Sequence, residues 1–271
     1  MSVRIEKAGA VWTIVHDRPE ARNAMDPASA DELTAAFLEF DAAKEASVAV
    51  FWGAGGAFCA GWDLKYVSTL DPTYPLGELD IPTLGSHVNG GEIPRGPLGP
   101  SRLELDKPVI AAIEGPAVAG GMELGLWCDF RVMARDAYFG VYCRRWGVPL
   151  IDGGTVRLPR IVGQGRALEI ILTGRKVPAD ECLAIGLCEY VTESGGARAK
   201  AEAIAQEIAR FPQTCVRVDR RSAIASQGKT VREGLVNEWY NGREALVTDG
   251  VAGASRFRDG LGRHGDFGKI H

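Results

Sequence analysis

The stretch from Lys107 to Leu158 constrains the fold most, because it predicts a strand, a glycine turn, a helix and a further strand within about fifty residues. Val109 to Ile113 is an apolar, β-rich run, and Gly120 and Gly121 precede a segment compatible with a helix up to Cys128. Backbone N–H groups in the first turn of a helix lack a partner and lie at the positive end of its dipole. The pattern suits a developing oxyanion, although such glycine pairs also occur in ordinary turns.

A second junction of the same kind lies earlier in the chain. Ser47 to Trp52 is almost wholly apolar, as expected of a strand buried on both faces, and it leads directly into GAGGAFCAGWDLK. Here too a strand ends in glycines before a predicted helix. Two such junctions can direct their free N–H groups at one point.

The remaining elements alternate between strands and helices and then become helical. Val3 to Glu6 and Ala10 to His16 predict a hairpin. Asp26 is a predicted N-cap with Pro27 at the first helical position. Further helices are predicted at 163–173, 178–186, 195–210, 213–226 and 229–247, with a strand at 187–191. This order predicts an α/β fold with a helical C-terminal part.

Between Val67 and Leu105 the chain is rich in Pro and Gly and shows little periodicity. Long irregular loops in compact domains are usually lids, binding loops or mobile insertions. We favour a segment that covers the substrate over a disordered insertion.

Composition and charge exclude several classes of protein. With a net charge of -4, the chain lacks the excess of basic residues that is typical of nucleic-acid-binding proteins. No apolar run approaches the roughly 18 residues of a membrane span, and the N-terminus lacks the apolar block of a signal peptide, which predicts a cytoplasmic protein without a membrane partner. The six cysteines form no CxxC pair and are predicted to be reduced and buried, and the four histidines lack metal spacing, so no metal site is expected.

With both junctions identified, the chain resembles the crotonase superfamily, also called the enoyl-CoA hydratase/isomerase family. The resemblance covers nearly the whole length. It is carried by four motifs in order: DRPEARNAM, AFCAGWDLK, AAIEGPAVAGGMELGLWCDFRV and LTGRKVPADECLAIGLCEYV.

The resemblance implies a fold of stacked ββα units, which form a spiral core, and a C-terminal helical region that mediates trimers or hexamers built as dimers of trimers. We therefore expect a core over 1–195 with the acyl-CoA site and an oligomerisation region over 196–271. The substrate would be an acyl-CoA thioester. No separate cofactor is expected, because coenzyme A is part of the substrate.

The resemblance also assigns site residues. The N–H groups of Trp62 and Gly120 would hold the thioester oxygen as the α-carbon region becomes enolate-like. The path of the acyl and pantetheine groups would be lined by Ala60, Trp62, Asp63, Leu64 and Lys65, and the loop with Arg22 and Ala24 would lie near the CoA nucleotide.

Hydratases of this family place two glutamates across the substrate. Glu123 matches the first, but the second position falls on Cys143 in FGVYCRRWG, and a thiol is a poor acid and base unless its pKa is lowered. Cys143 is therefore expected to fill the pocket rather than act as a nucleophile. Asp152 in PLIDGGT is a candidate to compensate, with the alternative that it is only a turn residue before two glycines.

A basic cluster near the C-terminus, Arg256, Arg258, Arg263 and His264, is either a contact for CoA phosphates or a solvated tail.

The function expected from these residues is an acyl-CoA enzyme of the hydratase/isomerase type in which Glu123 acts as acid or base. Without the second glutamate, isomerisation, hydrolysis and decarboxylation stay open. A non-catalytic acyl-CoA binding protein is the alternative from another class.

Overall fold

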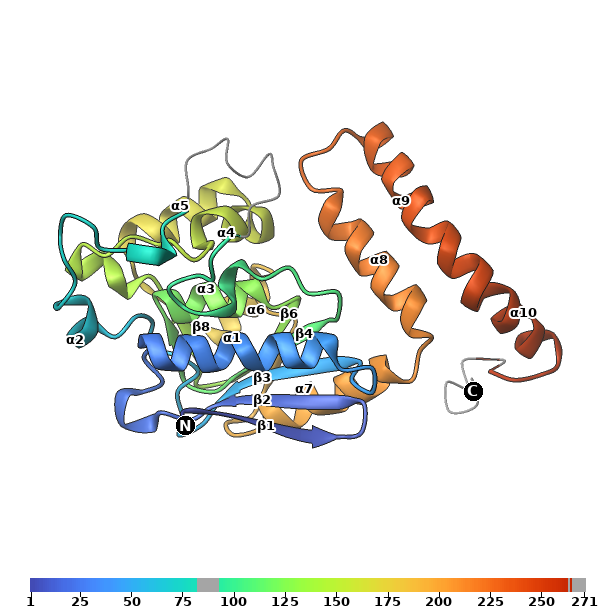
Figure 1. The fold of residues 1–271 in the computed structure, drawn as a ribbon, viewed down its shortest axis with the longest axis horizontal. Coiled ribbons are helices and arrows are strands. Elements are labelled where there is room, and N and C mark those ends of the chain that lie inside the picture. Colours follow the sequence, from blue (N-terminus) through green and yellow to red (C-terminus); the bar gives the residue numbers. More distant parts are fainter. Residues whose placement is uncertain (82–92, 263, 265–271) are drawn as a thin grey trace.

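The computed structural model describes residues 1–81, 93–262 and 264. At its centre lies a six-stranded sheet in the order β1–β2–β3–β4–β6–β9 (Figure 1). β1 and β2 pair as an antiparallel hairpin, and every later neighbour is parallel. β2 and β4 are buried along their whole length, which agrees with the wholly apolar sequence of β4 and the largely apolar sequence of β2. The strands are β1 Val3–Ala8, β2 Val11–His16, β3 Val48–Gly53, β4 Val109–Ile113, β6 Phe130–Ala134 and β9 Tyr190–Thr192.

A second layer consists of the short strands β5 (Pro116–Val118), β7 (Tyr138–Gly140) and β8 (Lys176–Pro178). Successive chain segments place one strand in the large sheet and the next in this layer: β4 is followed by β5 and then by helix α3 (Gly120–Trp127). β6 and β7 repeat the pattern. This arrangement confirms the predicted stacked ββα core.

Helices α1 and α7 pack against the large sheet. α1 (Pro27–Ala42) begins as predicted, with the Asp26 side chain accepting a hydrogen bond from the Ser29 N–H at 2.8 Å. Its Phe37 ring lies edge-on to Phe51 of β3, with ring centroids 5.5 Å apart. α7 (Ala197–Ala209) contacts β2, β3, β4 and β6.

The other helices are shorter or lie towards the C-terminus. The α-helices are α2 Leu64–Val67, α4 Gly154–Val162, α5 Gln164–Thr173, α6 Ala179–Ala184, α8 Gln213–Ala225, α9 Val231–Ala245 and α10 Val251–Arg258. A π-helical turn, η6 (Leu246–Gly250), joins α9 to α10. The 3-10 turns are η1 Pro19–Ala21, η2 Gly77–Leu79, η4 Pro100–Arg102 and η5 Tyr142–Trp146.

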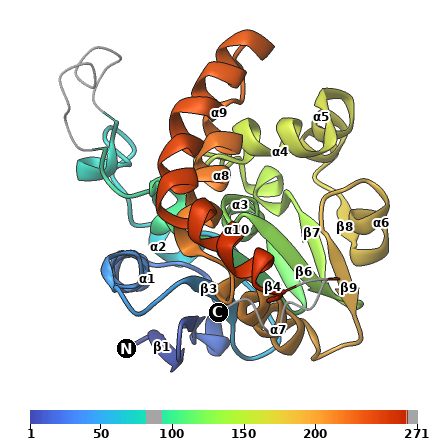
Figure 2. The same cartoon turned by 90° about the vertical axis from the view of Figure 1, so that its right-hand side faces the viewer.

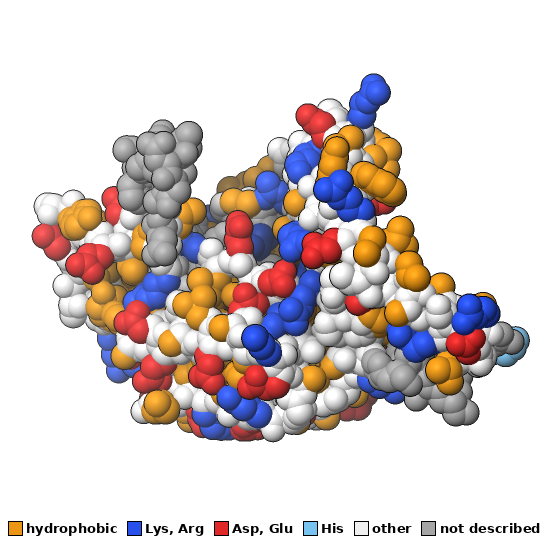
Figure 3. Space-filling view, turned by 45° about the vertical axis from the view of Figure 1, so that its right-hand side comes forward, with side chains coloured by type: hydrophobic (Ala, Val, Ile, Leu, Met, Phe, Trp, Pro, Cys, Tyr) orange, Lys and Arg blue, Asp and Glu red, His pale blue; other side chains and the backbone are white. Residues whose placement is uncertain are grey.

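The helices α8, α9 and α10 form an arm that projects from the body (Figures 1 and 2). Arg220 of α8 ties it to the core by donating to Asp129 at 2.8 Å and to the Leu105 carbonyl at 2.6 Å. Large apolar side chains gather on the arm (Figure 3). Those more than half exposed include Val231, Leu235, Trp239, Leu246, Val247 and Val251.

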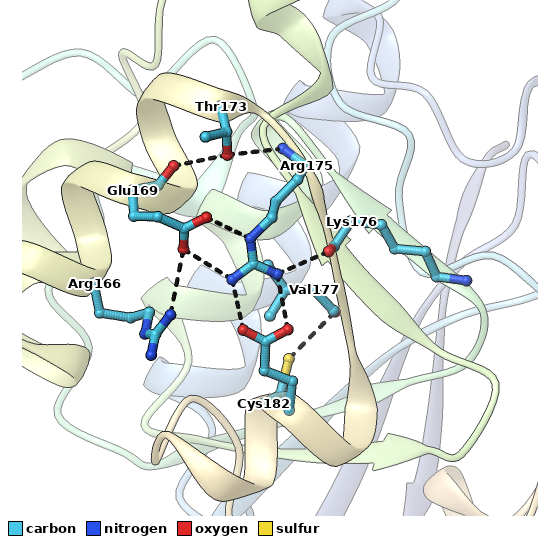
Figure 4. A network of polar contacts seen from close by, with 8 residues as sticks. Arg166, Glu169, Thr173, Arg175, Lys176, Val177 and Cys182 are labelled. Atoms are coloured by element: carbon cyan, nitrogen blue, oxygen red, sulfur yellow. Dashed lines mark hydrogen bonds and ion pairs between the residues drawn. The ribbon is translucent and has the colours of Figure 1, made fainter.

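Arg175, which directly precedes β8, joins this strand to α5 and α6 (Figure 4). Its guanidinium donates to Glu169 of α5 at 2.5 and 2.8 Å and to Glu181 of α6 at 2.5 and 2.8 Å. The same group reaches the Lys176 carbonyl at 3.1 Å. The clamp fixes α5 and α6 against β8.

Most predicted elements are present, but some elements were not predicted and some bounds differ. Helix α4 was not predicted, because Pro159 and the glycines before the helix interrupt its periodic pattern. The strand predicted at 187–191 begins only at Tyr190. Of the six cysteines, none forms a disulfide and five are buried as expected, but Cys215 is exposed because it lies on α8, in the arm that projects from the body. The division at residue 195 stays a prediction.

Candidate active site

The two glycine junctions predicted from the sequence lie against each other. Cys59 and Ala117 form a parallel β-bridge, and the Val118 N–H donates to the Cys59 carbonyl at 3.0 Å. A Cβ added to Gly121 would lie 2.0 Å from that same carbonyl oxygen, so only glycine permits this approach. The strand-to-helix turn after β3 therefore packs directly on the N-terminus of α3.

Trp62 and Gly120, one from each junction, line the same cavity. Neither backbone N–H donates a hydrogen bond to a described atom. A Cβ added to the neighbouring Gly61 would lie 3.0 Å from the Gly120 nitrogen, which places the two turns in contact. Both residues therefore lie at one cavity, and the convergence of their N–H groups on an oxyanion stays a prediction.

Ala119, immediately before Gly120, has φ 54° and ψ -122°, a conformation that residues with a Cβ rarely adopt. Its N–H donates to the Gly140 carbonyl at 2.8 Å, which anchors the turn on β7. Such strain costs about 1–3 kcal/mol and tends to occur at functional sites. Here it sets the direction of the free Gly120 N–H.

The loop with Arg22 and Ala24 holds the first junction from its other side. The Ala60 N–H donates to the Arg22 carbonyl at 3.1 Å, and Met25 pairs with Trp62 through a parallel bridge. Arg18 strengthens this contact because its guanidinium donates to the Ala24 carbonyl at 2.8 Å and to Asp63 at 2.9 Å.

Not every predicted binding residue reaches the cavity. Ala60, Trp62, Leu64 and Gly120 line it. Asp63 instead caps α2 by accepting from the Lys65 N–H at 3.0 Å, and the Lys65 side chain is exposed. Arg22 and Ala24 lie in the adjoining loop. Their proposed contacts with the nucleotide therefore remain predictions.

The cavity has a volume of about 80 Å³ and a largely apolar wall. Leu98 and most of the wall formed by the segment after β7 were not predicted from the sequence. Cys143 and Asp152 were both predicted at the site, so the residues between them in the sequence could have been predicted as wall residues. The wall residues that were missed are Leu98, Ala119, Tyr142, Trp146, Val148, Pro149 and Ile151.

Glu123 is a buried carboxylate in the first turn of α3, with 2% of its surface exposed. Its Oε1 accepts hydrogen bonds from the N–H groups of Asp152 at 2.9 Å and Gly154 at 2.8 Å. Its Oε2 has no hydrogen bond to a described residue. Burial, reinforced by the nearby charge of Asp152, raises the pKa of Glu123 to about 7, close to the value that suits proton transfer at neutral pH.

Asp152 is the second buried carboxylate of the cavity, with 1% of its surface exposed. Its Oδ1 accepts from the Leu98 N–H at 3.1 Å and from the Ser101 hydroxyl. Its Oδ2 is buried without a partner among the described residues. Burial raises the pKa of Asp152, while the Ser101 and Leu98 hydrogen bonds oppose this shift. Asp152 thus has contacts beyond those of a turn residue.

Cys143 lines the cavity near Glu123. Burial and the charge of Glu123 raise the pKa of its thiol, despite the partial opposition of Arg144. Arg145 does not reach the thiol to activate it, since it stacks on the Tyr142 ring at 4.2 Å. The structure therefore supports a protonated thiol in the pocket wall.

Two further expectations concern metals and membranes. The described residues contain no group of three or more His, Cys, Asp or Glu side chains that would hold a metal ion. Across the same ranges, no helix combines the length and the apolar run needed to cross a bilayer.

The predicted basic cluster lies at the end of the arm. Arg256 and Arg258 are on α10, and His264 follows it with an exposed side chain. Arg263 lies outside the described residues. None of the three described members lines the cavity within this chain.

Comparison with known proteins agrees with the geometry. A family model described as enoyl-CoA hydratase/isomerase matches residues 6–74 and 101–237. The chain is 32% identical to enoyl-CoA hydratase EchA19 of Mycobacterium tuberculosis, over 90% of this chain and 88% of that protein. It is 33% identical to carnitinyl-CoA dehydratase of Escherichia coli strain K12, over 88% and 84% of the two chains.

A solved structure gives the same picture. The fold is similar to that of an enoyl-CoA hydratase from Bacillus anthracis, with a TM-score of 0.84 and 29% identity, over 96% of both chains.

Proposed function

The chain belongs to the enoyl-CoA hydratase/isomerase family, the crotonases, and from this premise we propose that it catalyses the addition of water to an enoyl-CoA thioester or the reverse dehydration. The named relatives at about 30% identity are hydratases and dehydratases, which favours this direction of chemistry. The proposed site is the cavity between Trp62, Gly120 and Glu123.

One observation carries the proposal: two unpartnered backbone N–H groups and two buried carboxylates share this cavity. The N–H groups of Trp62 and Gly120 would bind the thioester oxygen and stabilise the enolate that forms when the β-carbon is attacked. Removing one donor from such a hole typically costs about 3 kcal/mol of transition-state stabilisation.

The carboxylates Glu123 and Asp152 would supply the proton transfers. Two buried carboxylates that repel each other do not both ionise readily, so the pair is expected to hold one proton. As the oxygen of water bonds to the β-carbon, the ionised member takes a proton from that water. The protonated member gives its proton to the α-carbon, so the elements of water are added across the double bond.

A specific observation favours isomerisation as a second candidate. The backbone N–H of Asp152 donates a hydrogen bond to the Glu123 carboxylate. We therefore expect the two carboxylates to lie beside each other rather than on opposite walls of the cavity. A carboxylate that removes a proton from one carbon and returns it to another needs no attacking water. The products distinguish the two reactions.

The enzyme assay uses crotonyl-CoA, longer 2-enoyl thioesters and 3-enoyl thioesters, with substrates and products separated by chromatography and their masses measured. Hydration predicts a product heavier by one water, and isomerisation predicts a product of unchanged mass from the 3-enoyl substrates. The control is Glu123→Gln, whose amide oxygen can accept the same two backbone hydrogen bonds but which cannot act as acid or base. Tight binding without turnover across the panel would contradict both reactions and indicate a non-catalytic acyl-CoA binding protein.

We also propose that the arm mediates a homotrimer or a hexamer. Several of its large apolar side chains are more than half exposed, and apolar side chains gathered on one surface often mark an interaction site. Sedimentation should therefore show three or six copies, and Trp239→Glu/Leu235→Glu should dissociate them. A monomeric wild-type chain would contradict this assembly. The cytoplasmic location stays a prediction.

A further inference from the structure

The two carboxylates of the cavity are held in the same manner, although they come from different elements. Each has one oxygen that accepts two hydrogen bonds and a second oxygen that accepts none from a described residue. Glu123 is held entirely by backbone N–H groups. Asp152 differs because one of its two donors is a side chain, the hydroxyl of Ser101.

Ser101 is itself fixed on both of its polar groups. It is 1% exposed and lies in the turn η4. Its hydroxyl donates to Oδ1 of Asp152, and its carbonyl accepts from Arg157 at 2.8 Å. Arg157 also donates to the Asp152 carbonyl at 2.9 Å, so the three residues form a closed ring of contacts.

The segment that contains Ser101 lies close against Asp152. A Cβ added to Gly96 would lie 1.9 Å from the Ser101 hydroxyl oxygen and 2.4 Å from Oδ1 of Asp152. Leu98 of the same segment lines the cavity, and a Cβ added to Gly120 would lie 2.7 Å from its side chain. This segment leaves no room for Oδ1 to turn, so the unpartnered Oδ2 is the oxygen left for the cavity.

We propose that Ser101 is a positioning residue of the acyl-CoA site: with the Leu98 N–H it holds Oδ1 of Asp152 and presents Oδ2 for proton transfer. This inference rests on the proposed function. Ser101 does not touch the substrate, and it acts only through the carboxylate of Asp152.

The charged groups around Asp152 have opposite effects on its ionised form. Glu123 of α3 repels its charge, while Arg102 of η4 and Arg157 of α4 attract it. The thiols of Cys59 and Cys143 lie in the same environment and are held protonated. Ser101 adds the hydrogen bond that most opposes the rise in the pKa of Asp152.

A double-mutant cycle tests the proposal. Ser101→Ala should lower kcat by about 10- to 100-fold with little change in KM, because the reacting oxygen is misplaced while the binding surface is kept. The acid limb of its kcat/KM profile should move to higher pH, because the pKa of Asp152 rises further. In an Asp152→Ala background, Ser101→Ala should have no additional effect on kcat.

Two variants control for folding. Ser101→Thr keeps the hydroxyl and should recover most of the lost kcat. Ser29→Ala removes an equally buried hydroxyl in α1, which bonds the Ser2 hydroxyl at 2.9 Å, and should leave kcat and the pH profile unchanged.

The outcomes separate this inference from the proposed function. An unchanged kcat and pH profile in Ser101→Ala, beside an impaired Asp152→Ala, would overturn the role of Ser101 alone. An equal effect of Ser101→Ala with and without the Asp152 carboxylate would do the same. A fully active Asp152→Ala would overturn the carboxylate pair and the role of Ser101 with it.

Discussion

The backbone N–H of Asp152 donates to Oε1 of Glu123 at 2.9 Å, and the carboxylate of the same Asp152 raises the pKa of Glu123. One residue thus fixes the orientation of its neighbour and tunes its charge. The pair combines one carboxylate of the motif on α3 with one from the loop before α4. By the resemblance described above, the position expected for a second glutamate of hydratases falls on Cys143.

The pH dependence of the reaction should report this pair. If catalysis needs one proton shared by Glu123 and Asp152, kcat/KM should be bell-shaped. The alkaline limb should lie near pH 7, where Glu123 loses its proton, and the acid limb lies below it, where both carboxylates are protonated. The measurement is kcat/KM against pH with a 2-enoyl-CoA. A rate that stays constant from pH 5 to about pH 9 would contradict the assignment.

The raised pKa of Glu123 also predicts a pH-dependent cost to stability. A carboxyl whose pKa is raised in the folded protein destabilises the fold when ionised. The cost is absent below about pH 4.5, grows as the pH rises and is complete above about pH 7. The shift from 4.5 to about 7 corresponds to about 3 kcal/mol.

Glu123→Gln should therefore be more stable than the wild type at pH 8 and nearly equal to it at pH 4.5. Urea unfolding at both pH values and at one protein concentration measures the difference. Comparing the variant with the wild type cancels the titration of groups that do not interact with Glu123. Equal stability at pH 8 would show that the Glu123 carboxylate is not strained by burial.

Cys143→Ala should keep kcat/KM within about threefold of the wild type, because a thiol with a raised pKa is protonated at neutral pH and cannot replace a carboxylate. The same assay provides the measurement. A loss of about 100-fold or more would assign the thiol a direct part in proton transfer.

Gly121→Ala should damage both the fold and the activity. The new Cβ would lie 2.0 Å from the Cys59 carbonyl oxygen, so the two junctions must separate. Overpacking of this kind costs about 1–3 kcal/mol. The matched control is Gly165→Ala in α5, where the new Cβ meets no atom within 4 Å and the helix should be slightly stabilised. Similar melting temperatures and rates for both variants would contradict the required close approach.

Much of the fold could be predicted from local signals. The Asp26 cap, the buried strands and the two glycine junctions are fixed by neighbouring residues, and the structure confirms them. The short strands β5 and β7 could not be found this way. Each has three residues and is stabilised only by pairing with a distant segment, as Ala117 does with Phe139.

The candidate site also contains residues that local signals predict and residues that they do not. Motif order placed Trp62, Gly120 and Glu123 together, since each lies at a recognisable junction. Ser101 and Leu98 carry no local signal, because their contacts with Asp152 span more than fifty residues of sequence. Only the folded chain shows that they hold a carboxylate.

The most direct test of the central claim is a crystal structure with an unreactive acyl-CoA bound in the cavity. The measured quantities are the distances from the thioester oxygen to the backbone nitrogens of Trp62 and Gly120. We predict that both lie between about 2.7 and 3.1 Å. A thioester oxygen that contacts only one of these nitrogens, or that lies outside the cavity, would contradict the account.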